Sequence, residues 1–165
     1  MATRSSLIAW GIAIASFGLL GYAYYLQHAE AMAPCPLCIL QRYAFALVGV
    51  CALISQLPPR SAGMGRWALL AAALAALVGA GVAARHVWVL EHPGSSCGRD
   101  LVEDFVNGLA PARWWPDMFM ADAPCGLPLE PVLGLQIPVW SLLWLSTLGV
   151  LSIVAARHAS RRRTR

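Results

Sequence analysis

Four stretches of this sequence are long and apolar enough to cross a membrane as helices. They cover about residues 7–26, 39–57, 67–90 and 138–156. A helix needs about 20 apolar residues to span the hydrocarbon core of a bilayer. The chain is therefore predicted to be an all-α integral membrane protein, a bundle of four transmembrane helices.

The composition excludes an ordinary soluble fold. Hydrophobic residues make up 59% of the chain and charged residues 12%, whereas a soluble domain carries roughly 25% charged residues. The length suits one domain, so we expect residues 1–165 to form a single four-helix transmembrane domain. The first apolar run exceeds the roughly 7–15 residues of a signal peptide, which predicts an uncleaved anchor.

The third span is rich in alanine and contains Gly79 and Gly81. Small residues let helices approach closely in lipid. We therefore expect this span to lie at the centre of the bundle.

The arginines predict the orientation of the spans, because positive charge flanking a span favours the cytoplasmic side. Those flanking one side are Arg4, Arg60, Arg66, Arg157, Arg161, Arg162, Arg163 and Arg165. All eight acidic residues fall in the two opposite segments, at about 27–38 and 91–137. Both termini are thus predicted to be cytoplasmic, and both loops to face the opposite, outer side. A basic tail after an apolar run is typical of a membrane anchor, so we expect no nucleic-acid partner.

The long outer loop carries an amphipathic pattern. Leu101, Phe105 and Leu109 recur at helical spacing with acidic residues between them, and Trp114 and Trp115 follow. Tryptophan favours the headgroup layer. Two alternatives stay open: a short interfacial helix along the membrane surface, or an ordinary amphipathic helix packed on the bundle.

Four of the five cysteines lie in the outer loops: Cys35, Cys38, Cys97 and Cys125. Thiols on the oxidising side of a bacterial-type membrane are expected to pair. The Cys-Pro-Leu-Cys spacing favours the pairs Cys35–Cys38 and Cys97–Cys125. Cys51 lies too deep in the second span to join them, and we expect a small buried side chain there.

The Cys35–Cys38 spacing points to thiol exchange, because so small a ring stabilises little by chain entropy. Pro36 can take the first helical position, which leaves Cys38 in the first turn of the second span. The helix N-terminus favours a thiolate there. Arg42 follows four residues later on the same face. We expect its guanidinium to stabilise the thiolate and to hold an anionic or carbonyl-bearing ligand.

The second pair has less specific surroundings. Cys97 and Cys125 lie among glycine, serine and proline residues, which predicts flexible, exposed positions. Alone, the pair would most simply be a structural disulfide that holds the outer loop together. Beside Cys-Pro-Leu-Cys it is also a candidate redox-active pair that passes electrons to Cys35 and Cys38. A zinc site is disfavoured because structural zinc usually takes two closely spaced pairs, and we expect no bound metal.

Arg85 and His86 lie near the outer end of the third span, and ionisable groups in a span indicate function by default. The alternative is structural: Arg85 extends to the interface and His86 bonds a neighbouring carbonyl. Their depth matches that of Cys38 and Arg42. A quinone would suit this level, because its carbonyls accept hydrogen bonds and its tail stays in lipid.

The motif Cys-Pro-Leu-Cys-Ile-Leu-Gln-Arg, the Arg-His-Val-Trp of span three, the two later cysteines and Gln-Ile-Pro-Val-Trp at the start of span four resemble the DsbB family. The resemblance covers nearly the whole chain. It implies a quinone-dependent thiol oxidase of the bacterial inner membrane, which uses ubiquinone or menaquinone. Its partner would be a periplasmic thioredoxin-fold dithiol oxidase similar to DsbA.

The resemblance also implies a role for each site residue. Cys97 would form the mixed disulfide with the partner, and Cys125 would resolve it by passing the exchange to Cys35. Cys38 would be the thiolate that faces the quinone, with Arg42 beside it and His86 nearby.

Two other functions remain as alternatives. One is a relative of vitamin K epoxide reductase, disfavoured because there the Cys-x-x-Cys lies in the last span of the bundle. The other is a structural tetraspan with a stapled outer loop, in which Cys35 and Cys38 need not cycle.

Overall fold

The computed structural model is all-helical and describes residues 4–57, 62–92, 99–125 and 131–160. Its helices are α1 (Arg4–Ala29), α2 (Pro36–Ile54), α3 (Ala62–Glu91), α4 (Arg99–Gly108), α5 (Ala110–Trp114), α6 (Pro116–Phe119) and α7 (Ile137–Ser160). Helices α1, α2, α3 and α7 are long and apolar enough to cross a membrane. The predicted four-span, all-α fold is confirmed.

The second span differs from its predicted bounds for a local reason. Helix α2 begins at Pro36 rather than at residue 39, because Pro36 suits the first turn and Cys35 caps it. It ends at Ile54, and residues 55–57 form a turn. Apolarity marks the part of a helix that can lie in lipid, whereas the cap determines where the helix starts.

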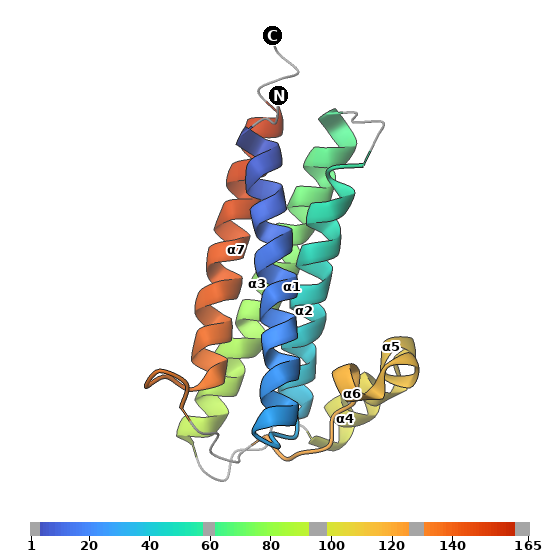
Figure 1. The fold of residues 1–165 in the computed structure, drawn as a ribbon, viewed down its shortest axis with the longest axis vertical. Helices are drawn as coiled ribbons and strands as arrows, with labels where there is room; N and C mark the ends of the chain where they lie inside the picture. Colours follow the sequence, from blue (N-terminus) through green and yellow to red (C-terminus); the bar gives the residue numbers. More distant parts are fainter. Residues whose placement is uncertain (1–3, 58–61, 93–98, 126–130, 161–165) are drawn as a thin grey trace.

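The four spans pack as a ring (Figure 1). Helix α1 contacts α2 and α7, and α3 contacts the same two helices. The contacts of α3 with α7 and with α2 are the most extensive between any two spans, so α3 is central to the packing of the bundle, as expected. Small residues of α3 line these contacts: Ala72, Ala73 and Ala76 are buried, and a Cβ at Gly149 of α7 would lie 3.4 Å from the Cβ of Ala76. A Cβ at Gly79 would overlap the Cβ of Ala44 and lie 3.1 Å from Leu145 Cδ1, whereas one at Gly81 would meet nothing within 4 Å.

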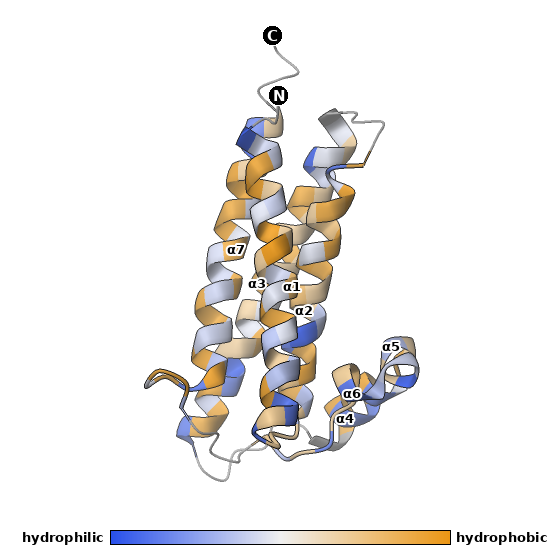
Figure 2. Ribbon diagram, in the orientation of Figure 1, coloured by the Kyte–Doolittle hydropathy of each residue, from blue (hydrophilic) through white to orange (hydrophobic). Residues whose placement is uncertain are grey.

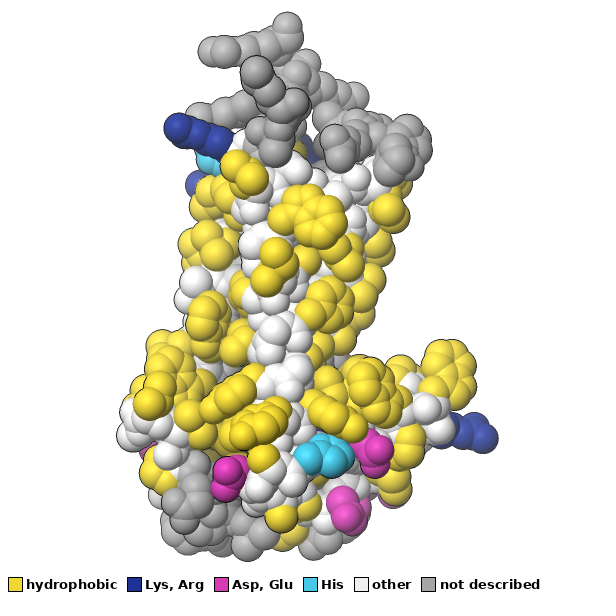
Figure 3. Space-filling model, viewed as in Figure 1, with side chains coloured by type: hydrophobic (Ala, Val, Ile, Leu, Met, Phe, Trp, Pro, Cys, Tyr) yellow, Lys and Arg dark blue, Asp and Glu magenta, His cyan; other side chains and the backbone are white. Residues whose placement is uncertain are grey.

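The outside of the bundle is apolar along its length (Figures 2 and 3). Large side chains such as Ile14, Leu74 and Val150 are more than half exposed on different helices. Charged side chains gather toward the two ends. An apolar belt of this kind would be unfavourable in water and suits the hydrocarbon core of a bilayer.

The described part of the outer loop, residues 99–125, forms three short helices rather than one. Proline in the first turn of α5 and of α6 starts each helix anew, which divides the segment. Val106 of α4 is buried against Ile39 of α2, while Leu101 and Phe105 stay 84% and 60% exposed. The segment therefore packs on the bundle and also keeps an exposed apolar edge, so it combines the two arrangements left open by the sequence.

The start of α1 and the end of α7 lie at one end of the bundle, and α4–α6 lie at the other (Figure 1). Ser5 Oγ donates a hydrogen bond to the carbonyl of Ala155 at 3.1 Å, which joins the two terminal helices there. The start of α2 and the end of α3 lie at the end that carries α4–α6.

Gly79 and Gly81 provide a matched test of the packing of α3. We expect Gly79→Leu to lower the free energy of unfolding by about 1–3 kcal/mol or more, because the side chain must displace Ala44 and Leu145. Gly81→Leu should leave it nearly unchanged. Thermal unfolding in detergent, followed by circular dichroism, measures both. Equal stabilities of the two variants would contradict the helix contact described here.

Candidate functional site

The site begins with the cap of α2. Cys35 has an extended backbone, with φ −83° and ψ 164°, and its sulfur accepts a hydrogen bond from the backbone N–H of Cys38, at 3.3 Å. Pro36 follows as the first helical residue and needs no partner for a backbone N–H. The cap thus brings Cys35 and Cys38 together at the outer end of the second span.

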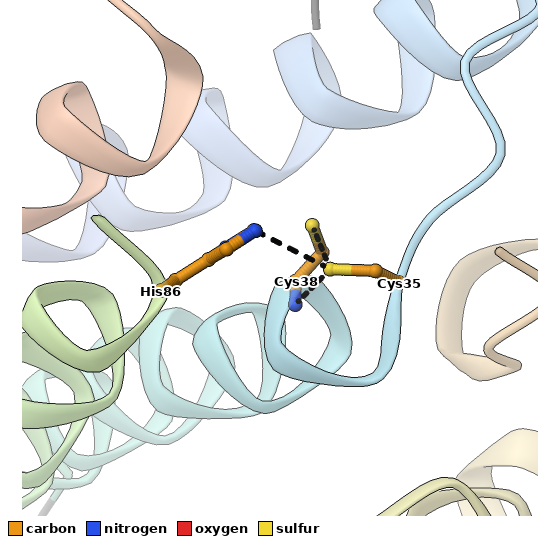
Figure 4. Close-up of side chains that lie close together, drawn as sticks. All are labelled: Cys35, Cys38 and His86. Atoms are coloured by element: carbon orange, nitrogen blue, oxygen red, sulfur yellow. Dashed lines mark hydrogen bonds between the residues drawn. The ribbon is translucent and has the colours of Figure 1, made fainter. Parts of the chain in front are cut away.

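The two sulfurs lie 2.8 Å apart, and both residues are free thiols. The structure therefore places the two sulfurs beside each other without a bond between them (Figure 4). Cys35 is buried, and Cys38 is half-buried. A pair in this geometry can close to a disulfide with little movement of the backbone.

His86 projects from α3 toward the pair (Figure 4). Its Nε2 lies 3.7 Å from Cys35 Sγ, and its Nδ1 lies 3.2 Å from Gln41 Nε2. The ring is 1% exposed. The donor atoms of Cys35, Cys38 and His86 fall within 4.8 Å of one another, and two cysteines with one histidine can hold zinc at a catalytic site. The Cys-x-x-Cys spacing at a helix N-terminus is also typical of a redox-active dithiol, and we interpret the cluster as a thiol site on that ground.

The two cysteines differ in their surroundings. The hydrogen bond to Cys38 and burial both raise the pKa of the Cys35 thiol well above its ordinary value. Cys38 stands in the first turn of α2, where the helix N-terminus favours a thiolate. When the pair loses one proton, Cys35 keeps its own and the negative charge rests on Cys38.

Arg42 lies one turn deeper on α2 and is 7% exposed. Its Nη1 donates to Gln27 Oε1 at 2.8 Å and to the carbonyl of Met118 at 2.9 Å. Its Nη2 donates to the carbonyl of Ala23 at 3.4 Å. Gln27 in turn donates through Nε2 to the carbonyl of Asp117 at 2.8 Å. The guanidinium therefore joins α2 to α1 and to α6.

A cavity of about 310 Å³ lies between α1, α2 and α7 at the outer end of the bundle. Its lining is mostly apolar, and Cys38, Gln41 and Arg42 form a polar wall on α2. Tyr22 and Trp144 line it as well and are 46% and 38% exposed, so the cavity reaches the apolar flank of the bundle. An apolar molecule with a polar head would fit such a cavity.

Cys38 and Arg42 thus face one cavity, as the spacing of four residues predicts. His86 is not among the residues that line this cavity, although Gln41, to which it is hydrogen-bonded, is; a nitrogen of the ring lies within 4.8 Å of both sulfurs. Arg85 points elsewhere, with its guanidinium 4.4 Å from the centre of the Trp88 ring.

The remaining cysteines differ from expectation in their exposure. Cys125 takes part in a disulfide bond and is only 3% exposed, so the expectation of an exposed position was wrong. It is buried because it packs in one cluster with Cys35, Leu37 and Val89. Cys97 lies outside the described residues, so the predicted Cys97–Cys125 pairing stays a prediction. Cys51 is a free thiol and is half-buried rather than buried.

Two glutamines of the site were not identified from the sequence. Gln41 bonds His86, and Gln27 bonds Arg42. The sequence does contain a feature that could have identified them: each is an amide side chain near the end of an apolar span, and such a group needs a hydrogen-bond partner. Their partners stand on other helices or far along the chain, and the sequence pattern does not name them.

Comparison with known proteins agrees with this geometry. Residues 5–155 match the family model of the disulfide bond formation protein DsbB. The disulfide bond formation protein B of Ralstonia nicotianae is 47% identical over 92% of this chain and 93% of its own length. That of Herminiimonas arsenicoxydans is 42% identical over 86% and 88%. Disulfide bond formation protein B 2 of Burkholderia lata is 40% identical over 90% and 86%.

The match covers all four spans and includes the capped dithiol, Arg42 and His86. The chain therefore belongs to the DsbB family, the quinone-dependent disulfide oxidoreductases of the membrane that re-oxidise DsbA in disulfide bond formation.

Proposed function

We propose that this protein passes electrons from a DsbA-like periplasmic dithiol through two of its own cysteine pairs to a quinone in the α1–α2–α7 cavity. One observation carries the proposal. Cys38 has its sulfur 2.8 Å from that of Cys35 and also lines the cavity beside Arg42. One side chain therefore belongs both to the dithiol and to the place where an electron acceptor would bind.

The lining of the cavity fits a quinone. Cys38 and Arg42 would hold the head group, because a guanidinium donates hydrogen bonds that a carbonyl oxygen accepts. Apolar residues such as Leu20, Phe45 and Trp144 would surround the ring and tail. A quinone bound there would supply an acceptor for the two electrons of the dithiol and, with two protons, would leave as the hydroquinone.

The buried cluster around Cys35 suggests how electrons reach the Cys35–Cys38 pair. Cys125 packs in the same cluster as Cys35, so the outer-loop disulfide and the dithiol are neighbours. We infer that Cys97 reacts with the partner dithiol and that Cys125 then attacks the Cys35–Cys38 disulfide at Cys35. Each step is a thiolate attack on a disulfide sulfur.

The distribution of charge supports an orientation with the dithiol in the periplasm. Arg4 and Arg66 stand at the end of the bundle where α1 starts and α3 begins, whereas Glu91, Glu103 and Asp117 stand at the dithiol end. The positive-inside rule then makes both termini cytoplasmic. Exposed Trp114 and Trp115 would rest at the outer headgroup layer of an inner membrane.

Replacing Cys38 tests its role directly. We expect Cys38→Ser to reduce the rate of quinone reduction, with reduced partner as electron donor, by at least about 100-fold. The serine hydroxyl cannot form a disulfide bond with Cys35, so the pair can no longer cycle. The loss of quinone absorbance measures the rate. Cys51→Ser on the same helix is the matched control and should keep the wild-type rate. Undiminished turnover of the Cys38 variant would refute the proposal.

Replacing Arg42 tests the polar wall of the cavity. We expect Arg42→Ala to raise the KM for quinone about tenfold or more while thiol titration still finds both disulfides, because one charged hydrogen bond contributes about 1.5–3 kcal/mol. Arg85→Ala removes an arginine at the same end of the bundle but outside the cavity, and should leave KM unchanged. A KM for the Arg42 variant equal to that of wild type would count against the assignment.

A further inference from the structure

Gln41 and His86 form a buried pair behind the dithiol. Gln41 is 4% exposed and His86 is 1% exposed. The amide of Gln41 lies 3.2 Å from the Nδ1 of His86, and the other ring nitrogen lies 3.7 Å from Cys35 Sγ. The imidazole therefore stands between a glutamine of α2 and the cysteine that caps the same helix.

Closing the Cys35–Cys38 disulfide requires a proton acceptor at Cys35. The step joins a Cys35 thiol to a Cys38 thiolate: the S–H bond of Cys35 breaks, one S–S bond forms, and two electrons leave to the quinone. One proton is released, and it comes from Cys35, because the pKa of that thiol is raised by its hydrogen bond to Cys38 and by burial. Cys35 is 5% exposed, so water has poor access to this proton.

We propose that His86 Nε2 accepts the Cys35 proton and that Gln41 is the positioning residue that holds His86 for this task. The inference deepens the proposed function and rests on it, because it concerns the same oxidation of the dithiol. It gives His86 a role at Cys35 and gives Gln41, which also lines the cavity, a role in holding that ring.

The amide of Gln41 suits both states of the ring. A glutamine side chain carries an acceptor oxygen and a donor nitrogen on one rotatable group. With the oxygen toward Nδ1–H, the lone pair of Nε2 faces the Cys35 thiol and can take its proton. The proton taken from Cys35 makes the ring an imidazolium, whose Nδ1–H still donates to the amide oxygen and whose Nε2–H can return the proton to sulfur when the disulfide is reduced. With its oxygen toward the ring, Gln41 thus selects the neutral tautomer that can accept the proton and also holds the protonated ring.

Few charged groups of the described chain act on this ring. Cys35 and Cys38 face it from the start of α2, and Cys125, which packs beside Cys35, is disulfide-bonded. Arg42 acts on the sulfurs from the cavity side. On α3 itself, the guanidinium of Arg85 lies over the Trp88 ring. The pH dependence of dithiol oxidation should therefore report on the imidazole and the two sulfurs.

Gln41→Leu and Gln41→Glu separate positioning from packing. We expect Gln41→Leu to slow the oxidation of the reduced dithiol about tenfold at neutral pH, a part of the roughly 10²–10⁴-fold that a positioned base contributes. In Gln41→Glu the carboxylate accepts from Nδ1–H and also stabilises the protonated ring. The rate should stay near wild type at high pH, and its acidic limb should move to higher pH.

A double-mutant cycle tests whether Gln41 acts through His86. We expect Gln41→Leu to have no further effect on the rate in a His86→Phe background. Ser152→Ala is the control for loss of a buried polar group, because Ser152 is fully buried and donates to Leu148 O within α7. It should keep the wild-type rate and pH profile. Equal effects of Gln41→Leu with and without His86 would overturn the inference.

A spectroscopic measurement provides a readout besides activity. The ¹⁵N chemical shifts of the His86 ring, assigned by comparison with His86→Phe, distinguish its two tautomers. We expect Gln41→Leu to change the tautomer populations and Ser152→Ala to leave them as in wild type. Shifts of His86 that are the same in wild type and in Gln41→Leu would overturn the positioning role.

Two oxidants distinguish failure of the inference from failure of the proposed function. The Cys35 proton must leave whether the reduced dithiol is oxidised by a quinone or by diamide. A Gln41→Leu defect with both oxidants supports the inference, and absence of the defect with both overturns it. If diamide oxidises the wild-type pair with the expected Gln41 dependence but the quinone does not react, the inference stands and the proposed quinone chemistry fails.

Discussion

The arrangement of the site depends on how α2 satisfies its first backbone N–H groups at the membrane boundary. A helix start in or near lipid has little water to bond, so the chain itself must supply the partners. Here Pro36 has no N–H to satisfy, and the sulfur of Cys35 accepts from the N–H of Cys38. The cap holds both sulfurs at one place, and the same helix start that favours a thiolate at Cys38 leaves Cys35 as the protonated partner.

The dithiol separates two environments. On one side Cys38 and Arg42 face a cavity that reaches the apolar flank of the bundle. On the other side Cys35 packs with Cys125 and lies beside His86. A pair placed in this way can take electrons from the outer loop on one side and deliver them on the other.

Arg42 shows how a buried charge is accommodated at this boundary. An unpaired guanidinium in a span would be costly, and Arg42 donates to the carbonyls of Ala23 and Met118 and to Gln27. These acceptors come from α1 and from α6. The residue that faces the cavity therefore also holds the outer-loop helices against the bundle, so changes in that loop would act on the position of the guanidinium.

The local sequence determined the four spans, the dithiol at the start of the second span, and the position of Arg42 one turn below Cys38. These features depend on apolar length, on the proline and cysteine at the helix start, and on helical spacing, all of which act within a few residues. The contacts of Gln41 with His86 and of Gln27 with Arg42 were decided by the tertiary structure, as were the burial of Cys125 and the position of His86 behind Gln41 rather than in the lining of the cavity. The physical reason is that periodicity describes the faces of one helix, whereas the neighbour that each face meets depends on how all four helices pack.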